Sequence, residues 1–185
     1  DMSSLKFILY GASPIAEAVL IQAMETFSKA EFGQGYGQTE LAPLATFLSP
    51  KYHTTTGPFA GKLKSAGQAI PCVEIKIVNE EGAELALGEI GEIAVRGPNA
   101  MVGYWNKPEE TAVSLRNGWV HTGDAGYMDA EGFVFLVDRV KDMIVSGGEN
   151  VYSAEVENAV NNHPAVDQVV VVGIPSEEWG EQVHA

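Results

Sequence analysis

The chain has 185 residues, 45% of them hydrophobic and 19% charged, which is the composition of a folded globular protein rather than a disordered one. A net charge of −14 with only 11 Lys and Arg residues argues against binding to nucleic acid or to an anionic membrane surface. The single cysteine, Cys72, excludes an internal disulfide, and no apolar run is long enough for a transmembrane helix. We therefore expect a cytoplasmic protein.

The first part of the chain is typical of a β-α unit. Residues 5–10 form an apolar run of strand length, and Ser13 and Pro14 supply an N-cap and a first-turn proline for a helix that extends to about Phe27. We expect three side chains on the buried face of this helix: Ile15, Val19 and Leu20.

Alternation with a period of two begins near residue 73. It predicts half-buried antiparallel strands over 73–78 and 89–96, followed by short strands around Val120 and over 133–137. We therefore expect residues 1–69 to form a β-α segment and residues 70–138 to form a small β-barrel-like subdomain.

Residues 141–185 are typical of the start of a second α+β domain. A hairpin is predicted with Gly147 and Gly148 at its turn, and Ser153 is placed to cap a helix that runs to about Asn162. The four valines at 169–172 predict a strand buried on both faces. Because the chain starts and stops at predicted strands, we expect a piece of a longer protein whose cut edges favour pairing between copies.

Residues 36–40, Tyr-Gly-Gln-Thr-Glu, carry the strongest chemical signal. Neighbouring glycines allow close approach to a ligand, Thr39 offers a hydrogen-bond donor to a phosphate oxygen, and Glu40 offers a hard oxygen ligand for Mg²⁺. The ring of Tyr36 has a flat face on which a base can stack. On local composition alone, an ordinary turn at a strand end explains the run equally well.

Three further polar clusters fall at the ends of predicted strands: residues 11–14, 119–124 and 138–142. The first is a helix cap, and a helix N-terminus can also hold a base edge or an anion. Asp124 either closes a Thr-Gly-Asp turn or binds a vicinal diol such as ribose. Arg139 is either a surface ion pair or the partner of Asp124 at a ligand, and His121 is expected to be structural.

The four clusters, in this order, resemble the signature motifs of the ANL adenylating superfamily. That superfamily comprises acyl-CoA and aryl-CoA synthetases, firefly luciferases and the adenylation domains of peptide synthetases. The resemblance covers nearly the whole chain and implies that a carboxylate attacks ATP to give an acyl-adenylate and pyrophosphate, after which a thiol displaces AMP. It implies a mixed α+β fold in which residues 1–140 end a large AMP-binding domain and residues 141–185 begin a mobile C-terminal domain.

The resemblance also assigns roles to single residues. Tyr36 matches the aromatic residue packed on adenine, Thr39 the contact to the AMP phosphate, and Glu40 the magnesium-associated carboxylate. Asp124 matches the carboxylate that holds the ribose diol, and Arg139 completes the ribose contact. The remaining nucleotide contacts are expected at Gly11, Ala12 and Ser13, which face the adenine, and at Gly37 and Gln38.

Residues 146–157 resemble the hairpin of acyl- and aryl-CoA ligases. By this resemblance Gly147 and Gly148 line the tunnel for the pantetheine arm of coenzyme A, and Lys141 is the hinge about which the C-terminal domain rotates. Luciferase-like members carry a lysine where this chain has Val145. We therefore expect an ATP-dependent acyl-CoA ligase for a fatty or other hydrophobic carboxylic acid, with Mg²⁺ and coenzyme A as further requirements.

Two parts of the superfamily pattern are missing from these 185 residues: the phosphate loop that precedes the Tyr-Gly-Gln-Thr-Glu motif and the catalytic lysine near the C-terminus. We therefore expect the 185 residues alone to be inactive. Two alternatives remain open. One is an AMP-binding module without catalysis, and the other is an adenylation domain that loads a carrier protein.

Overall fold

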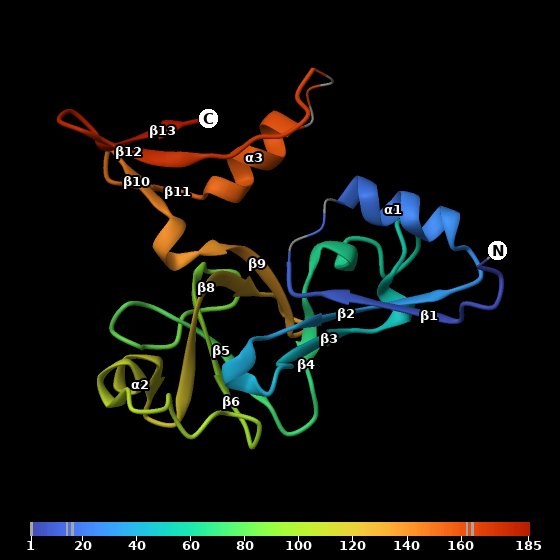
Figure 1. The fold of residues 1–185 in the computed structure, drawn as a ribbon, viewed down its shortest axis with the longest axis horizontal. Coiled ribbons are helices and arrows are strands. Elements are labelled where there is room, and N and C mark those ends of the chain that lie inside the picture. The colour runs from blue at the N-terminus through green and yellow to red at the C-terminus, as the bar shows by residue number, and fades with distance from the viewer. Residues whose placement is uncertain (1, 14, 16, 162, 164) are drawn as a thin grey trace.

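The structure is a computed structural model that describes residues 2–13, 15, 17–161, 163 and 165–185 (Figure 1). Its described strands form a nine-stranded sheet and a four-stranded sheet. The first sheet contains β1 (Phe7–Gly11), β2 (Glu31–Tyr36), β3 (Thr46–Leu48), β4 (Gly67–Ala69), β5 (Glu74–Val78), β6 (Gly91–Arg96), β7 (Leu115–Arg116), β8 (Trp119–Met128) and β9 (Phe133–Arg139). The second contains β10 (Ile144–Ser146), β11 (Glu149–Val151), β12 (Val172–Ser176) and β13 (Gly180–His184). The mixed α+β class is confirmed.

In the described part of the chain, three α-helices and four short 3-10 helices connect these strands. They are α1 (Glu17–Thr26), α2 (Pro108–Ser114), α3 (Ser153–Asn161), η1 (Thr39–Leu41), η2 (Pro50–Tyr52), η3 (Lys62–Lys64) and η4 (Val140–Asp142). No helix in the described part of the chain is long and apolar enough to cross a membrane.

The large sheet runs across the expected boundary between residues 69 and 70. Its order is β1-β2-β3-β4-β9-β8-β6-β5, with β7 added beside β8. The β1–β2 pair is parallel and the other pairs are antiparallel, and β4 pairs with β9 through Gly67 opposite Val134 and Gln68 opposite Phe133. Among the described strands the path ends at β1 and β5, so the sheet is open and the β-α segment continues into the β-rich part.

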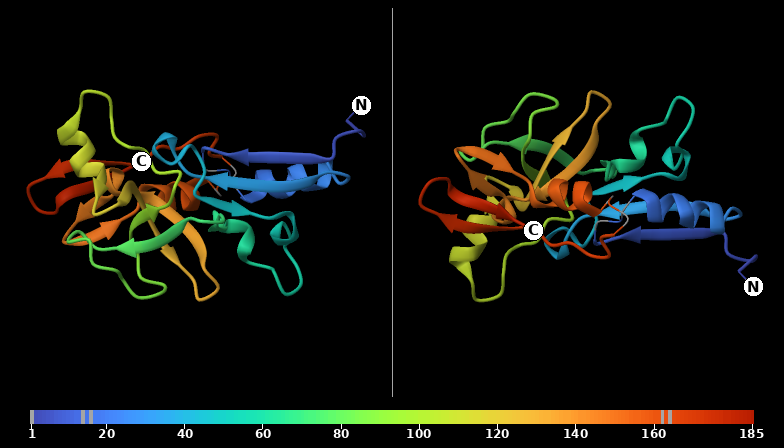
Figure 2. Two further views of the ribbon diagram at one scale, coloured as in Figure 1. Left: turned by 90° about the horizontal axis from the view of Figure 1, so that it is seen from below. Right: turned by 90° about the horizontal axis from the view of Figure 1, so that it is seen from above.

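Helix α1 packs on one face of β1 and β2 (Figures 1 and 2). Leu20 is buried there together with Phe32, and Ile21, Ala23, Met24 and Phe27 pack against them. The predicted burial of Ile15 and Val19 is wrong, since they are 38% and 54% exposed. Residues 20, 24 and 27 share a helical face, and this face rather than that of Val19 meets the sheet. The predicted helix start at Pro14 lies outside the described residues.

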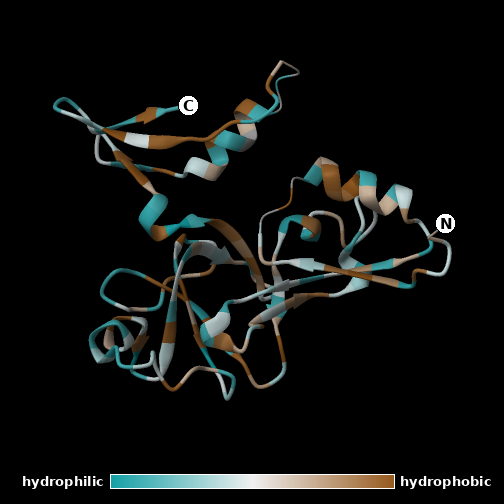
Figure 3. Ribbon diagram, in the orientation of Figure 1, coloured by the Kyte–Doolittle hydropathy of each residue, from teal (hydrophilic) through white to brown (hydrophobic). Residues whose placement is uncertain are grey.

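The second sheet has the order β11-β10-β13-β12. Its β10–β11 hairpin turns at Gly147 and Gly148, whose φ values of +61° and +84° suit the two-residue turn predicted there. The prediction of a strand buried on both faces is wrong. Strand β12 begins only at Val172, and the exposed fraction alternates along the run, from 70% at Val170 to 4% at Val171 and 47% at Val172. Figure 3 shows the hydrophobic residues along β12 in brown.

The two sheets are joined through η4 and by a contact at the start of α3 (Figure 1). The Asp138 Oδ2 atom accepts hydrogen bonds from the Ser153 hydroxyl at 2.8 Å and from the Ala154 N–H at 3.3 Å. Asp138 of β9, rather than Ser153 itself, therefore supplies the side-chain acceptor at the N-terminus of this helix. The predicted far end of the helix at Asn162 lies outside the described residues.

Leu20→Ala tests the observed orientation of α1. Removing this buried side chain leaves a cavity against β1 and β2 and is expected to lower the free energy of unfolding by about 2–4 kcal/mol. Val19→Ala, one residue away on the exposed side, is the control and is expected to change it by less than about 0.5 kcal/mol. Urea titration followed by circular dichroism measures both, and equal losses would contradict the orientation of the helix.

Candidate functional site

The predicted segments at residues 11–13 and 36–40 meet at one edge of the large sheet. Strands β1 and β2 run parallel with Gly11 opposite Gly35, so the segments that follow the two strands leave the sheet at the same end. A Cβ atom on Gly11 would lie 2.1 Å from the Gly35 carbonyl oxygen, which accounts for glycine at this position. Ala12 follows in a left-handed conformation with φ +66°, and Ser13 is exposed. The carboxyl ends of parallel strands are a common place for a ligand.

Tyr36, Asp124 and Arg139 come together although they lie on three different strands. The Tyr36 hydroxyl donates a hydrogen bond to Asp124 Oδ2 at 2.8 Å. Asp124 and Arg139 are direct partners in the β8–β9 ladder, and Arg139 Nε lies 3.5 Å from Asp124 Oδ1. Tyr36 is only 8% exposed, whereas the Arg139 side chain is 62% exposed. The arrangement presents a carboxylate, fixed by a buried tyrosine, beside an accessible guanidinium.

The surroundings of these side chains keep Tyr36 neutral and disfavour the charged form of Asp124. Burial raises the pKa of Asp124, while the hydrogen bond from Tyr36 and the charge of Arg139 oppose that shift. Burial, followed by the Asp124 charge, raises the pKa of Tyr36 far above its usual value. Tyr36 therefore remains a hydrogen-bond donor across the physiological pH range.

Asp124 is held by a bulge in the middle of β8 rather than by a turn at a strand end. On β6, Glu92 pairs with Ala125 while Ala94 pairs with His121, so β8 carries extra residues between these two pairs. Gly123 has a φ of +73° there. The Thr122 hydroxyl donates to the Ile93 carbonyl at 2.8 Å and accepts the Asp124 N–H at 3.1 Å. Bulges of this kind re-aim a side chain out of the regular ladder.

Glu92 contacts this bulge and was not predicted from the sequence. Its Oε2 atom lies 2.7 Å from His121 Nδ1 and 3.2 Å from Arg116 Nη2, and its Oε1 atom accepts the Gly123 N–H at 3.1 Å. The available signal was a carboxylate placed directly before the fully buried Ile93 in a strand. His121, expected to be structural, is 7% exposed and makes its described contact with Glu92.

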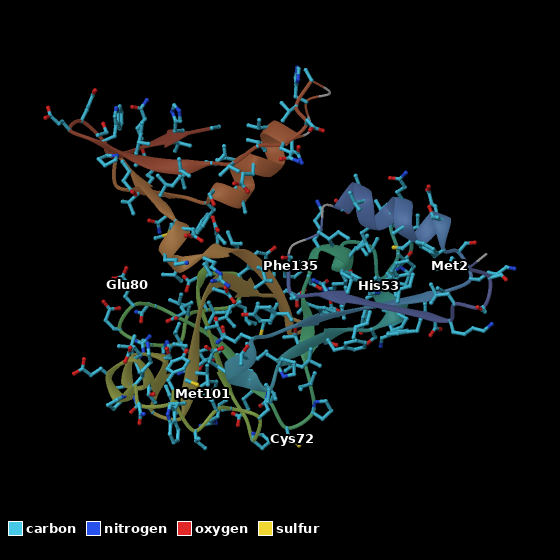
Figure 4. All side chains as sticks on the ribbon, viewed as in Figure 1. Met2, His53, Cys72, Glu80, Met101 and Phe135 are labelled. Carbon is cyan, nitrogen blue, oxygen red and sulfur yellow. The ribbon has the colours of Figure 1, made fainter. Side chains whose placement is uncertain are left out.

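Glu40 is held by a second segment that the sequence analysis did not single out, residues 99–104. Glu40 Oε1 accepts a hydrogen bond from the Tyr104 hydroxyl at 2.6 Å, which raises the pKa of Tyr104. The Glu40 carbonyl accepts the Met101 N–H at 2.8 Å, and Met101 is labelled in Figure 4. Asn99 Nδ2 donates to the carbonyls of residues 41 and 44, both at 2.8 Å. Helix η1 is thereby fixed, with Thr39 exposed on it.

The donor set suits a magnesium ion shared with phosphate oxygens. Mg²⁺ in such sites takes one or two protein carboxylates and completes its shell with phosphate and water. Glu40 supplies one carboxylate next to the exposed Thr39 hydroxyl. Within the described residues no group of three or more His, Cys, Asp or Glu side chains is arranged to hold a metal ion, so the chain offers no complete metal cage in that part.

The remaining predicted residues lie in and beside the second sheet. Lys141 is exposed in η4, between β9 and β10. The Gly147 N–H donates to the Trp179 carbonyl at 2.9 Å, and a Cβ atom on Gly147 would lie 2.9 Å from the Trp179 ring. Gly148 has open space beside it. Local backbone geometry and the tryptophan account for both glycines, and their predicted role at a pantetheine tunnel stays a prediction.

Comparison with known proteins gives matches over the whole chain. A family model described as AMP-binding enzyme matches residues 1–105, and one described as AMP-binding enzyme C-terminal domain matches residues 155–185. A fatty acid–[acyl-carrier-protein] ligase from Streptomyces coeruleorubidus is 46% identical over 100% of the chain and 35% of the relative. A medium/long-chain-fatty-acid–CoA ligase from Mycobacterium tuberculosis is 45% identical over 100% of the chain and 31% of the relative.

A solved structure resembles the chain in the same way. The o-succinylbenzoate CoA synthetase of Bacillus subtilis, in complex with its acyl-adenylate intermediate, superposes with a TM-score of 0.86 at 40% identity, over 98% of this chain and 36% of that one. The same synthetase has been solved with ATP and a magnesium ion. The chain thus spans about a third of the length of the proteins that it matches.

Asp124→Asn tests the electrostatics of the site. A carboxyl whose pKa is raised in the folded state favours folding when protonated, and that contribution is lost as the pH rises through the folded pKa. Asp124→Asn, which can still accept from Tyr36, is therefore expected to be more stable than wild type at pH 7. This gain is expected to fade as the pH falls below the folded pKa and towards 3.8, the usual pKa of an aspartate side chain.

The measurement is the free energy of unfolding of both proteins by urea titration across this pH range. Asp167→Asn, at an exposed carboxylate, is the control and is expected to change stability by less than about 0.5 kcal/mol at each pH. A difference between wild type and Asp124→Asn that does not vary with pH would show that burial of the charge is not its cause.

Proposed function

Because the chain belongs to the AMP-binding enzyme family, within the ANL adenylate-forming superfamily, we propose that the whole protein is an ATP-dependent acid–thiol ligase. In the proposed reaction a carboxylate attacks the α-phosphorus of ATP, releasing pyrophosphate and forming an acyl-adenylate. A thiol then displaces AMP to give the thioester. Since the chain spans about a third of the relatives' length, turnover is assigned to the whole protein and nucleotide contacts to this part of it.

The observation that carries the proposal is the group formed by Tyr36, Asp124 and Arg139. A carboxylate can accept hydrogen bonds from both hydroxyls of a ribose, and Asp124 is already held in place by Tyr36 at 2.8 Å. Arg139, beside it and largely exposed, can complete the contact. We assign Asp124 and Arg139 to the ribose of ATP, the acyl-adenylate and AMP.

The adenine and phosphate groups are assigned to the edge where β1 and β2 end. The backbone of Gly11, Ala12 and Ser13 is proposed to face the adenine, with the largely buried Tyr36 ring beside it. Residues 37 and 38 continue this contact towards the phosphates. Thr39 is exposed and can donate to the α-phosphate, since its helix η1 is fixed by the contacts of residues 99–104.

Magnesium is assigned to Glu40. A bound Mg²⁺ would neutralise charge on the phosphate oxygens during adenylation. The role of the protein is to present the carboxylate in one orientation, which the Tyr104 hydroxyl achieves through Glu40 Oε1. One oxygen of Glu40 is thus fixed by the protein, and the carboxylate can face the ion with the other.

The acid substrate is proposed to be a fatty or other hydrophobic carboxylic acid, as the names of two relatives suggest for those proteins. Coenzyme A is proposed as the thiol, with Gly147 and Gly148 beside the pantetheine arm. Lys141 is proposed as the hinge between a domain ending at residue 140 and a mobile domain starting at residue 141. We expect a cytoplasmic enzyme.

A second acceptor is favoured by a specific observation. The relative from Streptomyces coeruleorubidus, 46% identical, is named as a ligase for an acyl-carrier protein. The whole protein could therefore pass its acyl group to the phosphopantetheine thiol of a carrier protein instead. Assaying acyl transfer to coenzyme A and to a holo acyl-carrier protein in parallel discriminates the two. Only with the true acceptor should the enzyme form a thioester and release AMP in equal amounts.

Asp124→Ala and Arg139→Ala test the ribose assignment. In the full-length protein, calorimetric titration with AMP is expected to show a loss of affinity of about 10- to 100-fold for Asp124→Ala, because hydrogen bonds to a charged group are lost. Arg139→Ala is expected to lose less, since its guanidinium is exposed. Glu74→Ala, at an exposed carboxylate of β5 paired with Arg96, is the control and should bind AMP normally. Unchanged affinity in Asp124→Ala would refute the assignment.

Glu40→Gln and Tyr104→Phe test the magnesium assignment. The full-length protein is expected to release pyrophosphate only when its carboxylic-acid substrate is present. The rate of this release is expected to fall steeply in Glu40→Gln, because a charged ligand of the ion is replaced by a neutral amide. Tyr104→Phe is expected to raise the Mg²⁺ concentration needed for half-maximal release, since it frees the carboxylate without removing it. Tyr127→Phe, whose ring stacks on Phe135, is the matched control. A normal Mg²⁺ requirement in Glu40→Gln would contradict the assignment.

A further inference from the structure

We propose that Glu92 is a positioning residue for nucleotide recognition: it holds the bulge of β8 so that the Asp124 carboxylate faces the ribose. The inference rests on the proposed function, because it gives Asp124 a ribose to bind. It adds a residue on another strand, β6, whose carboxylate does not itself touch the ligand.

The first observation is that Glu92 bridges three separate groups. Its Oε2 atom is 2.7 Å from His121 Nδ1 and 3.2 Å from Arg116 Nη2, and its Oε1 atom accepts the Gly123 N–H at 3.1 Å. Arg116 lies on β7, and the other two residues lie on β8. A single carboxylate on β6 therefore ties β7 to the start of the bulge at His121 and to its middle at Gly123.

The second observation is the backbone requirement of the bulge. The pairing steps two positions along β6, from Glu92 to Ala94, while it steps four along β8, from His121 to Ala125. N–H groups in such an insertion leave the regular ladder, and a partly buried N–H without an acceptor is destabilising. Thr122 Oγ1 accepts the Asp124 N–H, and Glu92 Oε1 accepts the Gly123 N–H. Glu92 thus supplies one of the two side-chain acceptors that shape the bulge.

The third observation is that the bridging carboxylate is itself fixed. The Glu92 side chain is 20% exposed, and the His121 ring with which it interacts is 7% exposed. Two donors from different strands act on Oε2, so Oε1 is directed at the backbone next to Asp124. Fixed orientation of a supporting residue is what allows a binding side chain to be presented without reorganisation.

The test separates positioning from general stabilisation by comparing two nucleotides. AMP has both ribose hydroxyls, whereas 2′,3′-dideoxy-AMP has neither and cannot make the diol contact with Asp124. Calorimetric titration of the full-length protein with each ligand gives the preference for AMP over the dideoxy nucleotide. A loss of general stability would weaken both ligands alike, while a displaced Asp124 would weaken AMP alone.

Glu92→Ala is expected to reduce this preference about 10-fold, because the Asp124 carboxylate loses its fixed hydrogen-bonding geometry, with little change in affinity for the dideoxy nucleotide. Glu92→Gln keeps the side-chain volume and one acceptor oxygen and is expected to lie between wild type and Glu92→Ala, so it serves if the alanine variant folds poorly. Glu74→Ala, which removes an exposed carboxylate from neighbouring β5, is the control and should keep the full preference.

Amide hydrogen exchange supplies a readout that needs no nucleotide. The Gly123 N–H is expected to exchange faster in Glu92→Gln and Glu92→Ala than in wild type, while amides of β5 are unchanged. A full AMP preference in Glu92→Ala, or an equal loss for both nucleotides, would overturn the inference. If Asp124→Ala abolishes the preference while Glu92→Ala keeps it, only the role of Glu92 fails. If wild type shows no preference, the ribose assignment fails and this inference with it.

Discussion

The hydrogen bond from the Tyr36 hydroxyl to the Asp124 carboxylate joins strand β2 to strand β8, which are not neighbours in the large sheet. Arg139 of β9 lies beside this bond, as the ladder partner of Asp124. Thr39 and Glu40, which are assigned to phosphate and magnesium, follow shortly after the end of β2. This hydrogen bond therefore sets the distance between the residues assigned to ribose, on β8 and β9, and the residues assigned to phosphate and magnesium, which follow β2. Tyr36 belongs to the main core cluster, so the packing of that core fixes the site directly.

The site is kept at a cost to stability. Burial raises the pKa of Asp124, and a charged carboxylate that is partly removed from water opposes folding at neutral pH. The positive φ of Ala12, a residue with a Cβ atom, adds local backbone strain. Supporting contacts offset these costs: Glu92 and Thr122 accept the N–H groups of the bulge, and residues 99–104 hold the segment that carries Glu40.

Sequence patterns were sufficient for the parts of the fold that local chemistry determines. The Gly147-Gly148 turn needs two positive φ values, and the mixed α+β class follows from the order of periodic segments. Where neighbouring side chains are all apolar, the pattern does not tell buried from exposed positions. Among the valines at 169–172 only Val171 is fully buried and only Val172 lies in a strand, and Val19 resembles Leu20 although only Leu20 meets the sheet. Motifs located Asp124 and Tyr36, but their contact, the bulge and the roles of Glu92 and Tyr104 depend on pairing between distant strands.

The central claim is that Asp124 recognises the ribose of an adenine nucleotide from the place where Tyr36 holds it. The most direct measurement is a crystal structure of the full-length protein with AMP and Mg²⁺. We predict that the two oxygens of the Asp124 carboxylate lie within hydrogen-bond distance of the ribose hydroxyls, with the Tyr36–Asp124 hydrogen bond retained. A nucleotide bound with its ribose away from Asp124, or an Asp124 turned away from Tyr36 in the complex, would contradict the account.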